Sequence, residues 1–171
     1  MNVNLKRSTF IGPRMSRTIP FQRSPQATRA RLSKAQLLPI PRAVADELAL
    51  VAHMSLTALR SGSSDVAPAQ HVTEAIYLAK FLAEAGHGDF SHEELLLADQ
   101  SMAAVFDIGR TSGSWILAPE DFERIAAIVS LYDHQLRRAS LAALSVASER
   151  LERFKAGEPY QSTQARKSAR V

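Results

Sequence analysis

Hydrophobic residues recur with a helical period along most of this chain, and the clearest pattern lies between Trp115 and Arg138. Apolar side chains there are spaced by three or four positions, and they are Phe122, Ile125, Val129, Tyr132 and Leu136. This spacing places them on one face of an α-helix. Pro119 suits the first helical position, because its missing N–H is not needed there. The pattern therefore predicts a packed helix that begins near Pro119.

A first helix is predicted upstream, from about Pro41 to Arg60. Its predicted core face consists of Val44, Leu48, Val51, Ser55 and Leu59, flanked by Met54 and Leu56. Pro41 again suits a first helical turn, and Gly62 with its neighbouring serines favours a loop.

A second helix is predicted from about Pro68 to Ala85. Its apolar stripe is Val72, Ile76, Ala79 and Ala83, with Phe81 and Leu82 beside it. The two alanines would let a neighbouring helix approach closely. Gly86 is placed to form a left-handed C-terminal cap.

The third predicted helix has the clearest start in the chain. Ser91 and Glu94 have the spacing of a capping box, and Phe90 with Leu95 is the matching hydrophobic staple. The pattern continues to about Ile108. Residues 109–114 (GRTSGS) are predicted to form a loop before the helix that begins near Pro119.

A fifth helix is predicted from about Ser140 to Lys155, ending at Gly157, with Leu141, Leu144, Leu151 and Phe154 as its apolar contacts. Residues 140–156 also loosely follow helix-turn-helix sequences. Ser145 stands where the turn glycine is usual, and Glu149 and Glu152 would face phosphates. One uninterrupted helix is therefore predicted.

These elements predict an all-α fold, a bundle of about five helices with a mobile basic N-terminal arm. The expected organisation is an arm at residues 1–38, a helical bundle at 39–157 and a polar basic tail at 158–171. At 171 residues, the chain is long enough for one domain with a sizeable core.

Charge is distributed unevenly along the chain. Residues 1–42 hold nine basic and no acidic residues, whereas residues 43–158 hold nine basic and all 17 acidic residues. The overall charge of +4 conceals this contrast between a basic arm and an acidic body.

The arm is the feature of the sequence with the strongest functional implication. Lys and Arg neutralise phosphates without a sequence code, and Phe10 and Phe21 could stack on unpaired bases. The predicted nucleic-acid contacts are Lys6, Arg7, Arg14, Arg17, Arg23, Arg29, Arg31 and Lys34. Alternatives are a solubilising tail, an organellar transit peptide, a shorter arm that starts at Met15, or a segment that docks on its own body, another copy or a protein partner.

Candidates for catalysis and metal binding are few. The chain has no cysteine, which excludes disulfides and thiolate chemistry. Glu84 and His87 have the Glu-x-x-His spacing of di-iron bundles, but the motif occurs once, where those sites need two copies. A loop metal site at His87 and His92 is an alternative to solvated loop residues. We therefore expect no enzymatic activity, no cofactor and no resident metal.

The stretch from Arg110 to Leu136 resembles a region of small helical proteins from proteobacterial phages, plasmids and genomic islands, some of which are labelled Fis-like regulators. The shared pattern is a Gly-x-Trp turn at residues 113–115, followed by a Leu-x-x-His-Gln-Leu-like signature at residues 131–136. The resemblance implies a bacterial cytosolic setting and a mobile-element origin, and it carries over no site residue.

Two functional hypotheses follow from the sequence. The first is a non-enzymatic accessory or regulatory protein that contacts nucleic acid through the arm. The second is a protein–protein interaction module, that is, an inhibitor, an adaptor or a self-assembling subunit that uses its helical faces. We expect a cytoplasmic protein without a membrane-spanning helix, because no apolar run approaches the roughly 18 residues that such a helix needs.

Overall fold

The computed structural model describes residues 34–160, which fold into five helices after a short helical segment at residues 34–37. The helices are α2 (Arg42–Ser61), α3 (Ala67–Glu84), α4 (His92–Ser112), α5 (Pro119–Leu136) and α6 (Leu141–Lys155). The predicted all-α bundle is confirmed. The described residues form no β-strand, only two isolated bridges between loops.

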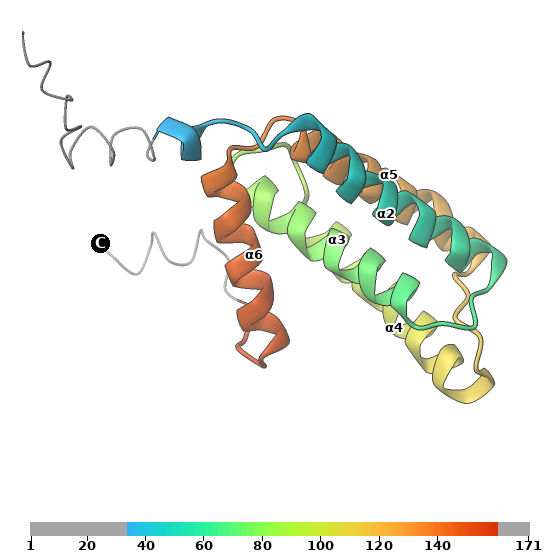
Figure 1. Ribbon diagram of the computed structural model, residues 1–171. Helices are drawn as coiled ribbons and strands as arrows, with labels where there is room; N and C mark the ends of the chain where they lie inside the picture. Colours follow the sequence, from blue (N-terminus) through green and yellow to red (C-terminus); the bar gives the residue numbers. More distant parts are fainter. Residues whose placement is uncertain (1–33, 161–171) are drawn as a thin grey trace, which may run out of the picture.

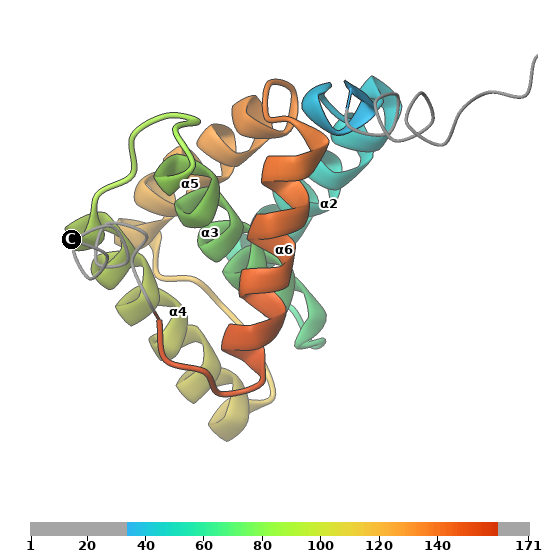
Figure 2. The same cartoon turned by 90° about the vertical axis from the view of Figure 1, so that its left-hand side faces the viewer.

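Helix α3 lies at the centre of the bundle and packs against each of the other four helices. Helices α2 and α5 run side by side along one side of it, and α4 lies on another side (Figure 1). Helix α6 crosses α3 at a steep angle (Figure 2). This placement explains why half of α3 is buried, including Val72, Ile76, Phe81 and Leu82.

The stripe predicted for α5 is confirmed, because Ile125, Val129, Tyr132 and Leu136 are buried and Phe122 is half-buried. Pro119 is the first residue of the helix, as predicted. On the facing side of α3, the alanines at 75 and 79 are fully covered. Small side chains at these positions allow neighbouring helices to approach closely.

The start of α4 is also as predicted. The Ser91 hydroxyl accepts a bond from the Glu94 amide, and the Glu94 carboxylate accepts one from the Ser91 amide at 2.7 Å. These hydrogen bonds lower the pKa of the Glu94 carboxyl. Phe90 is buried, and its carbonyl accepts a 2.5 Å bond from the buried ammonium of Lys80. The α3–α4 loop is thus tied to the central helix.

The predicted end of α4 is wrong. Residues 109–112 continue the helix to Ser112, and the left-handed cap falls at Gly113. Gly109 was expected to start the loop, but it lies buried within the last turns of the helix, directly beneath the indole of Trp115. From the sequence alone, a glycine inside a helical pattern suggests that the helix ends there. Here Gly109 continues the helix, and its missing side chain leaves space for the indole ring of Trp115.

We predict that Gly109→Ala destabilises the protein by about 1–3 kcal/mol, although this change in a free helix would stabilise it by about 1 kcal/mol. The reason is that a methyl group at this position would overlap the indole ring of Trp115. Urea unfolding measures the effect. In a Trp115→Ala background the overlap is gone, so Gly109→Ala should there be stabilising. Destabilisation in both backgrounds would contradict this account.

Helix α6 is a single uninterrupted helix, as predicted, and not a helix-turn-helix. Of its predicted contacts Leu151 is buried, whereas Leu141 is 40% exposed. The buried Ala147 was not predicted.

The residues that follow α6 differ from the predicted polar tail. Tyr160 stacks on Phe81 and on His92, with ring centroids about 6 Å away in both cases. Its hydroxyl donates to Glu84, and burial together with this bond raises the pKa of Tyr160. The sequence does not indicate the packing of Tyr160, because one aromatic ring among polar residues has no periodicity to reveal it.

Gln135 holds α5 against the α3–α4 loop. It is 3% exposed, and its Nε2 donates to the Ala79 carbonyl at 3.0 Å and to the His87 carbonyl at 2.8 Å. One side chain therefore satisfies a carbonyl of the central helix and a carbonyl of the loop that follows it. Within the Leu-x-x-His-Gln-Leu-like signature, this glutamine has a structural role.

We predict that Gln135→Ala lowers the free energy of unfolding by about 2 kcal/mol, because two buried carbonyls lose their donor. Thermal and urea unfolding measure the change. The matched control is Gln100→Ala on α4, where the glutamine is exposed and the expected change is within about 0.5 kcal/mol. Equal effects at the two positions would show that the Gln135 bonds contribute little.

Candidate protein-interaction surface

Helix α2 buries three alanines, one serine and two leucines, and it exposes most of its other large apolar residues. The residues buried against α3 and α5 are Ala45, Ala49, Ala52, Ser55, Leu56 and Leu59. The predicted core positions Val44, Leu48 and Val51 are instead exposed, as is Met54. The predicted face is therefore wrong by about a quarter of a turn, and only Ser55 and Leu59 of it are buried.

The reason is that α2 carries two neighbouring apolar stripes. One consists of large side chains and the other mostly of alanine, and each has helical spacing. A period shows that a stripe exists but does not say which of two stripes meets the core. Close packing against α3 and α5 selects the stripe that begins with three alanines, and this stripe also buries Leu56 and Leu59 toward the end of the helix.

We define the outer face of α2 as Val44, Leu48, Leu50, Val51 and Met54. Together with Leu37 and Leu38 just upstream, these are seven of the 13 exposed large hydrophobic residues in the described chain, and they are 39–70% exposed. Monomeric proteins seldom expose contiguous apolar patches beyond a few hundred Å². A helix that is apolar on nearly all sides is expected to be covered.

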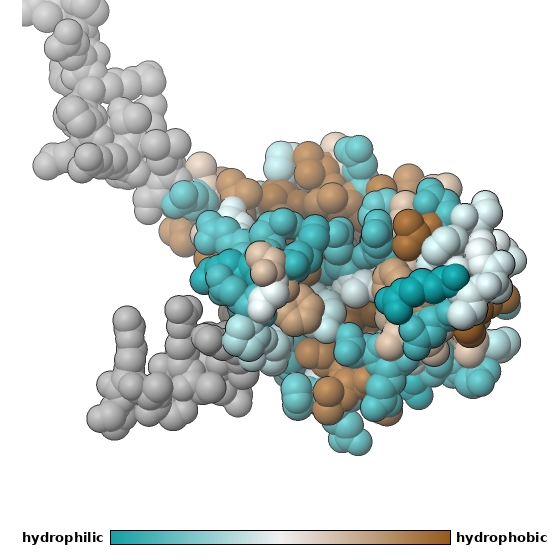
Figure 3. All heavy atoms as spheres, turned by 90° about the horizontal axis from the view of Figure 1, so that it is seen from below, coloured by the Kyte–Doolittle hydropathy of each residue, from teal (hydrophilic) through white to brown (hydrophobic). Residues whose placement is uncertain are grey.

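The apolar region continues toward α6. The Leu141 amide donates to the Leu38 carbonyl at 2.8 Å, and Pro39 forms an isolated bridge with Ser140. These contacts hold the exposed side chains of Leu37 and Leu38 at the end of the bundle, beside the exposed Leu141. Elsewhere, hydrophobic residues reach the surface in smaller, separate groups, as on the face seen from below in Figure 3.

One carboxylate lies within the outer face. Glu47 is three or four positions from Val44, Leu50 and Val51, so these four side chains are neighbours on the helix surface. Glu47 is exposed, and it makes no ion pair with any residue in the range 34–160. Residues 43–59 contain no Lys or Arg. The face is therefore apolar with a single negative centre.

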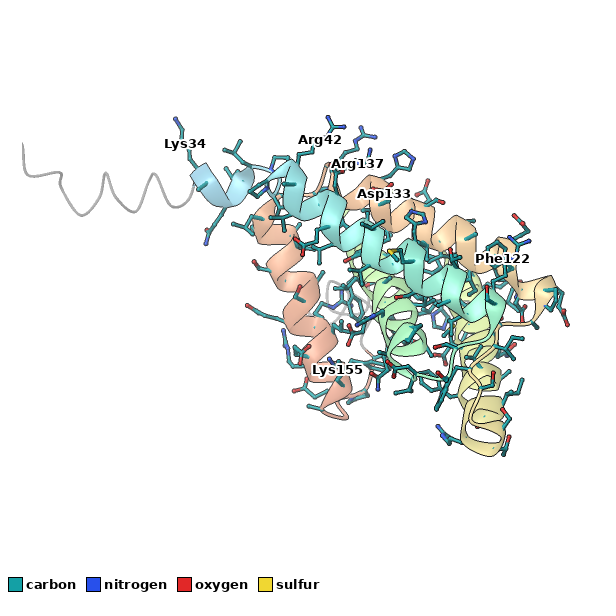
Figure 4. The ribbon with its side chains drawn as sticks, turned by 45° about the vertical axis from the view of Figure 1, so that its right-hand side comes forward. Lys34, Arg42, Phe122, Asp133, Arg137 and Lys155 are labelled. Carbon is teal, nitrogen blue, oxygen red and sulfur yellow. The ribbon has the colours of Figure 1, made fainter. Side chains whose placement is uncertain are left out.

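The basic residues next to this face are neutralised by acids. Arg42 lies 3.6 Å from Asp46, and Arg137 lies 3.6 Å from Asp46 and 2.9 Å from Asp133. Figure 4 shows Arg42, Arg137 and Asp133 at the same end of the bundle as Lys34. Because each of these arginines has an acidic partner, the described body presents no concentrated positive surface here.

Of the predicted nucleic-acid-binding residues, the structure describes only Lys34, which is exposed. Lys6, Arg7, Arg14, Arg17, Arg23, Arg29 and Arg31 lie outside the described residues. The arm's role in binding stays a prediction. Sequence reasoning missed the outer face of α2, although the all-round apolar character of residues 42–59 is a signal that could have indicated it.

The histidines do not assemble a site. No group of three or more His, Asp or Glu side chains within residues 34–160 is arranged to hold a metal ion. His87 and His134 line a cavity of about 380 Å³ with Gln135 and Arg138. His87 follows the end of α3, and His134 lies in the last turn of α5. The helix dipole favours basic side chains at both places. Their placement is thus explained by helix termination.

A larger cavity of about 520 Å³ lies between parts of α3 and α6, which also contact each other directly. Its charged groups satisfy one another, because Arg150 pairs with Glu84 at 2.8 Å and lies 4.1 Å from the ring of Phe81. These contacts join α6 to the central helix. The arrangement is that of a structural contact.

No protein-family model, curated protein or solved structure matches this chain. Among the described helices, none has an apolar stretch long enough to cross a bilayer.

Proposed function

We propose that this protein acts by binding another protein, with the outer face of α2 as the docking surface. The observation that carries the proposal is the orientation of α2, which packs alanines inward along its first half and exposes leucine, valine and methionine on the outer face. Burying these side chains would contribute about 25 cal/mol for each Å² covered. If this face of α2 contacted only solvent, nothing would favour large apolar side chains on it.

The surface favours an amphipathic helical partner. Its large side chains follow spacings of three and four, which suit a second helix that lays apolar residues between them. Glu47 adds a requirement for a basic residue on the partner, because burying an unpaired carboxylate is costly. The expected activity is that of an adaptor, an inhibitor or an assembly subunit, as in the second sequence-based hypothesis.

We predict that a photo-crosslinking residue at Val51 in the full chain, expressed in its native cell, joins one defined protein. Val51 and Ile108 are both 43% exposed, but Ile108 lies on α4, away from the outer face. A crosslinker at Ile108 is therefore the matched control and should yield no such product. Leu48→Asp should abolish the product at Val51 while leaving the helical circular dichroism unchanged.

Equal products from positions 51 and 108, or a product at 51 that survives Leu48→Asp, would show that the outer face is not a docking surface.

A second candidate function is nucleic-acid binding by the arm, with an accessory or regulatory role. The observation that favours it is the charge of the sequence, since residues 1–42 carry nine basic residues and no acid. The body is net acidic and repels phosphates, so any such binding should depend on the arm.

We predict that reversing the charge of Arg14, Arg17, Arg23, Arg29 and Arg31 weakens binding to labelled DNA or RNA at least tenfold. The affinity of the unaltered chain should fall steeply between about 50 and 200 mM salt, because phosphate contacts release counterions. Fluorescence anisotropy measures both effects. Charge reversal at the exposed Arg110 and Arg153 on the body is the control, and an equal loss there would contradict binding by the arm.

A further inference from the structure

The outer face of α2 sets three requirements for its occupant. The occupant needs apolar side chains to cover the large hydrophobic residues, and it needs a basic group to face Glu47. It must also reach the length of the face, which extends from Val44 to Met54. The 20 residues of α2 span about 30 Å at 1.5 Å for each residue.

A second copy of α2 meets the first requirement but fails the second. In an antiparallel two-fold pair centred on the outer face, each Glu47 would lie near its symmetry mate, at roughly 10 Å or less by helical rise. No Lys or Arg occurs between residues 43 and 59 to neutralise either carboxylate. Two desolvated carboxylates without basic partners would oppose such a dimer.

The N-terminal residues of the same chain meet all three requirements. Residues 1–33 contain seven Lys or Arg and no acidic residue, and they include Phe10, Ile11 and Phe21. They join the body at Lys34, immediately before the face. A chain of 33 residues reaches up to about 110 Å when extended, so it can turn back and follow the whole of α2.

Attachment to the body favours this contact further. A short tether keeps two segments of one chain at an effective concentration of about 1 mM or more. An interaction too weak to detect between separate molecules would therefore be substantially populated within one chain. The arm is basic and the body is net acidic, so electrostatic attraction also favours contact between them.

We propose that residues 1–33 dock on the outer face of α2 of their own chain and must leave before a partner binds there. This inference rests on the proposed function, since it assigns the regulation of the same docking surface. Glu47 faces an arginine or lysine of the arm, and the apolar residues of the arm cover Leu48 and Val51. The arm thus acts as an intramolecular competitor.

The absence of cysteine from the chain gives a direct test, because a single introduced cysteine can be labelled cleanly. A nitroxide at Gln22→Cys, beside the apolar Phe21, in the full ¹⁵N-labelled chain should broaden the amide signals of Val44, Leu48 and Val51 at least twofold more than those of Ile108 and Val146. Glu47→Lys should remove most of this difference. The matched control, Glu123→Lys, makes the same charge change on the exposed surface of α5 and should leave it intact.

A mixture of nitroxide-labelled ¹⁴N chain and unlabelled ¹⁵N chain separates the possible occupants. Broadening confined to the single-chain sample supports docking within one molecule. Equal broadening in the mixture shows that the arm occupies a second copy, and this overturns the proposal. Uniform weak broadening over all surfaces also overturns it. The crosslink from Val51 to a separate protein tests the docking surface by another readout, so a failure of the proposed function is distinguishable from a failure of arm docking.

Discussion

The structure depends on the burial of one central helix. Helix α3 contacts the four other helices, and its side chains supply hydrophobic contacts on nearly every side. Its alanines at 75 and 79 permit close approach, while Phe81 and Leu82 fill the wider spaces. Because interiors pack at the density of organic crystals, the helices around α3 must fit their side chains to it. This packing constraint decides which side of each neighbouring helix is buried.

Polar contacts then hold the connections around the central helix. Lys80 and Gln135 both reach the α3–α4 loop, and each satisfies a buried carbonyl. At the end of α3, Glu84 receives both Arg150 of α6 and the hydroxyl of Tyr160. Buried carbonyls and carboxylates are costly unless they find such donors. These few contacts therefore define how the loop, α6 and the following residues sit on a mostly aliphatic core.

The same constraint accounts for the proposed function. Close approach of α3 and α5 fits the alanines along the first half of the inner side of α2, followed by the buried Leu56 and Leu59, so the large apolar residues on the other side of the helix are left in solvent. Exposed leucine and valine on a helix next to the carboxylate of Glu47 are the features from which we propose binding of a complementary helix or strap. The basic arm, joined at the start of the same helix, has the opposite charge. Regulation and recognition would thus share one surface.

The sequence by itself determined the number and approximate bounds of the helices, because helical spacing, the Ser91 capping box and Pro119 are local signals. It also determined the buried face of α5, where one apolar stripe stands alone. Only the tertiary structure decided which of the two stripes of α2 meets the core, since both have the same period and differ only in volume. It also decided that Gly109 continues a helix under Trp115 and that Tyr160 packs against α3. These outcomes depend on the space between residues distant in sequence, which no local pattern records.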